Sequence, residues 1–95
     1  MARRQPAIPP EVAEVLRHLP PEIKRSVKAA IRAIGANPAA GEPLEEELEG
    51  LWKFRVRRYR VIYRIDKRGN AVRIFAVGQR RSIYEEVAEL LRSRK

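Results

Sequence analysis

The chain has 95 residues, 44% hydrophobic and 35% charged, which is enough apolar material for a single domain over residues 1–95 with a thin two-layer core. Its 21 Lys and Arg against 12 Asp and Glu give a net charge of +9, which favours a polyanionic partner. The absence of cysteine excludes disulfide scaffolds, thiolate metal sites and cysteine nucleophiles. Because no apolar stretch resembles a signal or membrane segment, we expect a cytoplasmic protein with no membrane partner.

The first third of the sequence predicts two helices. Three prolines at positions 6, 9 and 10 restrict residues 3–8 to a short edge strand at most. A Pro-Pro-Glu triplet at 9–11 and another at 20–22 each favour a helix start, because proline suits the first turn and glutamate complements the dipole. Gly35, Asn37 and Pro38 favour the end of the second helix. The predicted apolar faces are Val12, Val15, Leu16 and Leu19, and then Ile23, Val27, Ala30, Ile31 and Ile34.

From residue 51 the apolar period changes from helical to two, which predicts strands. We expect antiparallel strands from residue 51 to 56, 59 to 66 and 71 to 77, with tight connections at 57–58 and 67–70. Ser82 and Glu85 have the spacing of a capping box, and Val87, Leu90 and Leu91 would form the apolar stripe of a final helix. The predicted fold class is α+β, with two N-terminal helices packed on a three- to four-stranded antiparallel sheet, plus a C-terminal helix.

The positive charge is concentrated in the predicted sheet. Residues 51–81 contain eleven of the 21 Lys and Arg residues, and Asp66 is the only acidic residue in this segment. Strand alternation places Lys53 and Arg55 on one face, and the hairpin brings Arg60 onto that face opposite them. A solvated sheet face is the ordinary explanation for such a pattern. Like charges on neighbouring strands repel unless an anion neutralises them, so we favour a phosphate-binding surface.

Several chemistries have no obvious residues to support them. The only histidine, His18, is expected near the end of the first helix, where it would interact with the helix dipole rather than act as a base. The basic segment has no cluster of carboxylates for a metal-dependent nuclease, and we expect no metal and no small-molecule cofactor. The acidic run before the sheet is read as a solvated segment; it consists of Glu42, Glu45, Glu46, Glu47 and Glu49.

Metal-free cleavage of RNA remains possible, with a 2′-hydroxyl attacking the neighbouring phosphodiester. Such a reaction needs a base, charge stabilisation at the phosphate and a proton for the leaving oxygen. Crowding by Arg55 and Arg60 disfavours the charged form of Lys53, which makes this lysine the candidate proton acceptor. Tyr84, near the start of the final helix, could stack on a base or transfer a proton, or it could simply fill space between helix and sheet.

Three sequence segments together resemble the RelE/ParE toxin superfamily: LWKFRV at residues 51–56, YRVIYRI at 59–65 and VGQRRSIY at 77–84. The resemblance implies a toxin of a type II toxin–antitoxin system, with a cognate antitoxin that covers the basic face or displaces the final helix. RelE-type members cleave mRNA in the ribosomal A site, so the ribosome with its mRNA is the second implied partner. ParE-type members poison DNA gyrase, and the short connection after Lys53 also resembles them.

The resemblance also implies roles for individual residues. Lys53 matches the strand lysine proposed as general base, Arg60 the arginine that stabilises the phosphate, Arg80 an acid or phosphate ligand, and Tyr84 the C-terminal tyrosine. The predicted RNA-binding surface comprises Lys53, Arg55, Arg57, Arg58, Arg60, Arg80 and Arg81. The leading hypothesis is a ribosome-dependent mRNA endonuclease; the alternatives are a gyrase inhibitor without nuclease activity and a non-catalytic basic RNA-binding module.

Overall fold

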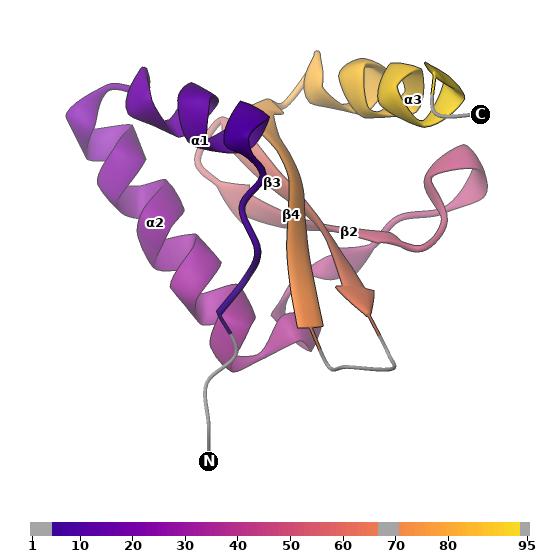
Figure 1. Cartoon of the computed structure of the whole chain (residues 1–95), viewed down its shortest axis with the longest axis horizontal. Helices are drawn as coiled ribbons and strands as arrows, with labels where there is room; N and C mark the ends of the chain where they lie inside the picture. Colours follow the sequence, from indigo (N-terminus) through magenta and orange to yellow (C-terminus); the bar gives the residue numbers. More distant parts are fainter. Residues whose placement is uncertain (1–4, 67–70, 94–95) are drawn as a thin grey trace.

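The computed structural model describes residues 5–66 and 71–93, and its elements follow the predicted order (Figure 1). The four strands form one antiparallel sheet in the order β1-β2-β3-β4. The α+β prediction is therefore confirmed. The elements are α1 (Pro10–Arg17), α2 (Pro21–Ala36), β1 (Glu42–Pro43), β2 (Leu51–Val56), β3 (Tyr59–Asp66), β4 (Ala71–Gln79) and α3 (Ile83–Ser93), with short 3-10 turns at Pro38–Ala40 and Glu46–Leu48.

The two N-terminal helices cover one face of the sheet. Each begins at the second proline of its pair, where the missing backbone N–H costs no hydrogen bond. From α1, Val12 and Leu16 lie four residues apart and join the core. Val15 was expected there too, but it is 42% exposed, because Val12 and Leu16 already occupy the side of the helix that faces the sheet. From α2 the buried residues are Val27, Ala30, Ile31, Ile34 and Gly35.

The final helix, α3, covers part of the opposite sheet face. Ile83 and Val87 are fully buried against Leu51, Ile62 and Ala76 in a second apolar cluster. The expected stripe is partly wrong. Leu90 is 45% exposed, and Ala88 is buried instead. The sheet thus has an apolar layer on each of its two faces. On the α3 face, Lys53 lies next to the start of this helix.

The acidic run is solvated as predicted, since all five of its glutamates are exposed, but it also contains a short strand that was not predicted. Glu42 and Pro43 form the two-residue strand β1, which pairs antiparallel with Lys53 and Trp52 of β2. At the other edge of the sheet, the predicted N-terminal strand is reduced to one parallel bridge between Ala7 and Arg73. Residues 3 and 4 of that prediction, and the predicted 67–70 connection, lie outside the described residues. No described helix is both long enough and apolar enough to cross a membrane.

Candidate functional site

The site is centred on the two-residue connection between β2 and β3, which we call the cationic turn (Arg57 and Arg58). Val56 and Tyr59 close the hairpin on either side of it. Arg57 has a φ of 57°, a left-handed conformation that residues with a Cβ rarely adopt. Two-residue hairpins favour positive φ and usually place glycine or asparagine there. The turn therefore carries a positive side chain at a position where another residue type would fit the backbone better.

The side chain of Arg60 supports this turn through hydrogen bonds to its backbone. It lies directly opposite Arg55 in the register, as predicted, and is only 5% exposed. One terminal nitrogen donates hydrogen bonds to the carbonyl oxygens of Arg57, at 3.1 Å, and Tyr59, at 2.9 Å. Its Nε–H is buried and has no hydrogen-bond partner among the residues that the structure describes. An unpaired buried donor costs about 1–3 kcal/mol, so this arginine is held in place at a cost in stability.

Arg80 joins the same end of the sheet through its backbone. Its N–H donates to the carbonyl oxygen of Arg58 at 2.8 Å, which ties the end of β4 to the cationic turn. Arg80 and Arg81 then begin the short connection to α3 and are exposed. The carbonyls of the turn are thus used to place Arg60 and Arg80, while the side chains of Arg57 and Arg58 remain exposed.

Lys53 and Tyr84 form a second part of the site, two residues along β2 from Arg55. The Lys53 Nζ lies 6.0 Å from the centre of the Tyr84 ring, at the limit of a cation–π contact. It also lies 3.6 Å from Oε1 of Glu42. The structure therefore brings Lys53 and Tyr84 together, and it adds a carboxylate that the sequence reasoning missed. A two-residue strand leaves no periodicity in the sequence, so the pairing of Glu42 with Lys53 had no detectable signal.

Tyr63 holds the segment that presents Glu42. Its hydroxyl donates to the carbonyl oxygen of Pro38 at 2.5 Å and accepts the N–H of Gly41 at 3.1 Å. Burial raises the pKa of Tyr63 above its usual 10.0, although the hydrogen bond from Gly41 opposes the shift. A Cβ at Gly41 would overlap both the backbone of Lys53 and the Tyr63 hydroxyl, so only glycine allows this approach.

The remaining candidates play no part in the site. His18 caps the C-terminus of α1, as expected, where it is exposed and its Nδ1 lies 3.0 Å from the carbonyl oxygen of Glu14. Beyond Glu42, the acidic segment reaches α3, where Glu47 lies 4.0 Å from Arg92. Within residues 5–66 and 71–93, no group of three or more His, Asp or Glu side chains could hold a metal ion. The titratable side chains that the structure places near Lys53 are Glu42 and Tyr84.

Comparison with known protein families places this chain in a class of toxins that belong to toxin–antitoxin systems. Residues 10–84 match the family described as ParE toxin of the type II toxin-antitoxin system, parDE. The chain therefore belongs to the ParE toxin family, within the RelE/ParE superfamily of type II toxins. Among curated protein sequences, none is significantly similar to it.

Solved structures agree with this assignment. A chain of the RelBE2 toxin–antitoxin complex from Mycobacterium tuberculosis is 30% identical, covers 84% of this chain and 94% of its own length, and has a TM-score of 0.74. A mutant of the E. coli toxin RelE in the free state is 18% identical, with coverages of 94% and 93% and a TM-score of 0.73. The YoeB/ParE toxin from Agrobacterium tumefaciens is 19% identical, with coverages of 80% and 98% and a TM-score of 0.67.

Proposed function

We propose that this type II toxin is a ribosome-dependent mRNA endonuclease that needs no metal. The observation that carries the proposal is the grouping of Glu42 and Tyr84 with Lys53, which lies on the strand that leads into the cationic turn, whose carbonyls position Arg60 and Arg80. In the reaction, a base removes the proton of a 2′-hydroxyl, whose oxygen attacks the adjacent phosphorus. The bond to the 5′-oxygen breaks, and that oxygen takes up a proton, so the products are a 2′,3′-cyclic phosphate and a 5′-hydroxyl end.

The proton transfers fall to the groups around Lys53. Lys53 can accept the proton when neutral, and the carboxylate of Glu42, 3.6 Å away, can accept it directly or from the lysine. Tyr84 is half-buried at the start of α3, with its ring centre 6.0 Å from the lysine Nζ. Its ring can stack on a base, and its hydroxyl can donate the proton to the leaving oxygen.

The arginines stabilise the negative charge that develops on the phosphate. Arg55, Arg80 and the cationic turn offer exposed guanidinium groups at one end of the sheet. Arg60 contributes its positive charge from a buried position, where two backbone carbonyl oxygens hold its guanidinium group. Donors fixed before the reaction stabilise a transition state without reorganisation, and loss of one such donor typically lowers the rate about 100- to 1,000-fold.

Two partners follow from this proposal. A domain of this size has little surface with which to distort RNA, so a ribosome that presents an unstacked codon would supply the positioning. The second partner is a cognate antitoxin, since the relatives from M. tuberculosis and Pyrococcus horikoshii were crystallised as toxin–antitoxin complexes. The basic surface, with a net charge of +9 on the chain, would attract an acidic partner as well as RNA.

A gyrase inhibitor is the second candidate function. It is favoured by one observation, the match of residues 10–84 to the ParE toxin family. This candidate predicts inhibition of DNA supercoiling while RNA remains intact. Salt-sensitive RNA binding without cleavage would instead indicate a binding module.

A translating extract distinguishes these functions. The wild-type chain should produce new 5′ ends in register with codons, and Arg80→Ala should reduce cleavage about 100-fold or more, because Arg80 is exposed and its truncation leaves the fold intact. Lys28→Ala, an exposed lysine on α2 remote from the site, is the matched control and should cleave like the wild type. Intact mRNA at a dose that arrests growth would refute the nuclease, and supercoiling inhibition by the same sample would select the gyrase inhibitor.

A further inference from the structure

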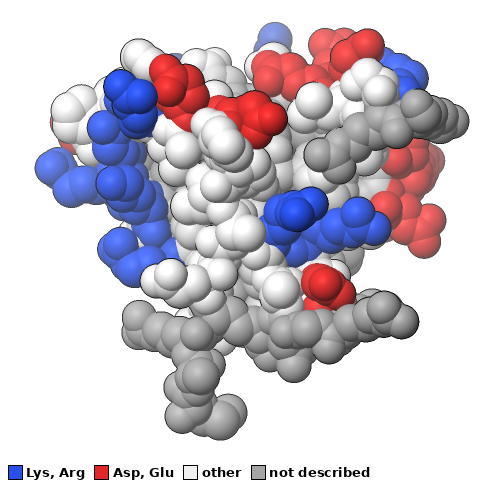
Figure 2. Space-filling model, in the orientation of Figure 1, with Lys and Arg blue, Asp and Glu red and all other residues white. Residues whose placement is uncertain are grey.

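An apolar groove lies away from the cationic turn, between the N-terminal segment, β4 and α3. Its volume is about 400 Å³. Residues 7–12 form one wall, Leu90 of α3 forms the other, and residues 73–75 of the edge strand β4 lie between them. In the view of Figure 2, a mostly uncharged surface separates two groups of Lys and Arg.

Two apolar side chains are exposed on the walls of this groove. Ile8 is 41% exposed and Leu90 is 45% exposed. Among the described residues, three large hydrophobic side chains are exposed, and these two belong to the groove; the third, Val15, does not line it. Exposed apolar side chains gathered around one cavity are typical of an interaction site, whereas single ones such as Val15 need no explanation.

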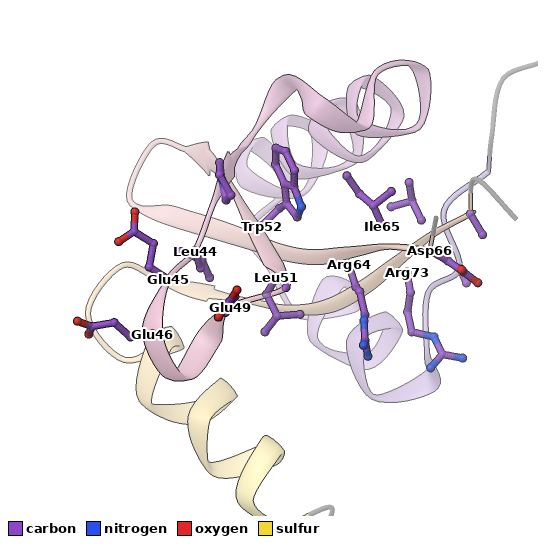
Figure 3. Close-up of a pocket in the computed structure, with 15 residues that line it drawn as sticks. Leu44, Glu45, Glu46, Glu49, Leu51, Trp52, Arg64, Ile65, Asp66 and Arg73 are labelled. Atoms are coloured by element: carbon purple, nitrogen blue, oxygen red, sulfur yellow. The ribbon is translucent and has the colours of Figure 1, made fainter. Parts of the chain in front are cut away.

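A pair of arginines adjoins the groove. Arg73 lines it, and lies directly opposite Arg64 of β3 in the sheet register. The close-up in Figure 3 shows the two side chains extending side by side from the same face of the sheet. Like charges in this position are destabilising, and neither arginine has an ion pair among the described residues. Glu11 also lines the groove, but no ion pair joins it to either arginine among the described residues. A carboxylate from outside the chain would relieve the repulsion between the two arginines.

We propose that the groove binds a segment of the cognate antitoxin, with apolar side chains against Ile8 and Leu90 and a carboxylate beside Arg73 and Arg64. The inference rests on the proposed antitoxin partner. RNA fits the arginines but not the mostly aliphatic walls. Phe75 is the one aromatic residue that lines the groove, and it is half-buried against the apolar cluster under α3, which leaves little of its ring for stacking on a base. A second copy of this chain is disfavoured, because each copy carries a net charge of +9. An acidic, partly apolar protein segment satisfies both parts of the surface.

The test measures binding of the protein encoded by the neighbouring reading frame, purified and titrated by calorimetry. Leu90→Glu and Ile8→Glu should each weaken binding about tenfold or more, because they place a charge in the apolar contact. Val15→Glu is the matched control, since its wild-type side chain is 42% exposed on α1 and does not line the groove. Arg73→Glu should also weaken binding, with Arg25→Glu on α2 as its control.

The binding measurements test the groove separately from the mRNA-cleavage assay that tests the proposed function. Groove variants that bind like the wild type would overturn the groove, even if the wild-type chain binds tightly and cleaves mRNA. A Val15→Glu loss equal to that of Leu90→Glu would also overturn it, because the contact would then not be specific to the groove. A wild-type chain that fails to bind the neighbouring protein would remove both the partner and its docking site. Self-association abolished by Leu90→Glu would assign the groove to a second copy instead.

Discussion

Tyr63 connects the central strand β3 to the segment that carries Glu42, and the change Tyr63→Phe tests that connection. The substitution removes a hydroxyl that makes two hydrogen bonds, with the carbonyl oxygen of Pro38 and the N–H of Gly41. Each such bond contributes about 0.5–1.5 kcal/mol, so the free energy of unfolding should fall by about 1–3 kcal/mol. For a domain of this size, 1 kcal/mol corresponds to about 4–8 °C in Tm.

The pH dependence gives this prediction a second measurement. The pKa of Tyr63 is raised by burial in the folded protein, so the folded state holds the phenolic proton more tightly than the unfolded state does. The associated stability is fully present below the unfolded pKa of about 10 and is lost as the pH rises through the folded value. The stability difference between wild type and Tyr63→Phe should therefore be constant up to about pH 9 and shrink above pH 10.

Tyr59→Phe is the matched control, because Tyr59 is half-buried on the same strand and no described hydrogen bond involves its hydroxyl. Urea unfolding of the three proteins, followed by circular dichroism, compares the two substitutions under identical conditions. A loss below about 0.5 kcal/mol for Tyr63→Phe, or an equal loss for Tyr59→Phe, would refute the role of the hydroxyl in holding the segment.

Three further predictions concern the neighbouring parts of the site. Arg57→Gly should leave stability equal or up to about 1 kcal/mol higher, because glycine accepts the positive φ, while mRNA cleavage falls; chemical unfolding and the extract assay measure the two effects. Gly41→Ala should destabilise the fold by more than about 2 kcal/mol in thermal unfolding, since its Cβ would overlap backbone that has no room to move. Glu42→Gln should change stability by less than about 1 kcal/mol, because the Glu42 side chain of the ion pair with Lys53 is 71% exposed. The same substitution should lower the cleavage rate at saturating mRNA, and an unchanged rate would exclude the carboxylate as a proton acceptor.

The strands and their register were predictable from the sequence, because alternation is a local property. The position of the cationic turn determines that Arg55 lies opposite Arg60, and the structure has that register. The same local reasoning failed for β1 and for Leu90. A two-residue strand has no period, and the direction in which Leu90 points depends on how α3 crosses the sheet. Strand β1 and the exposure of Leu90 therefore depend on contacts between distant parts of the chain, which local sequence patterns do not record.

The burial of Arg60 was also beyond the reach of sequence patterns. Alternation correctly placed its side chain on the charged face, and an arginine on a sheet face is ordinarily exposed. The tight turn instead brings two carbonyl oxygens within reach of its guanidinium, which satisfies part of its hydrogen-bonding capacity without water. Only the backbone conformation at Arg57, which sequence propensities disfavour, makes that arrangement possible.

The central strand β3 links the parts of the molecule that function requires. Its residues alternate between the two sheet faces, so Arg60 and Arg64 lie on the α3 face and Tyr63 on the face covered by α1 and α2. Arg60 then holds the cationic turn, Tyr63 holds the segment with Glu42, and Arg64 faces Arg73 beside the apolar groove. A slip of one residue in β3 would exchange the two faces and disrupt all three places at once. The proposed catalytic surface and the proposed antitoxin groove therefore depend on one register, which the fully buried Val61, Ile62 and Tyr63 secure from both sides of the sheet.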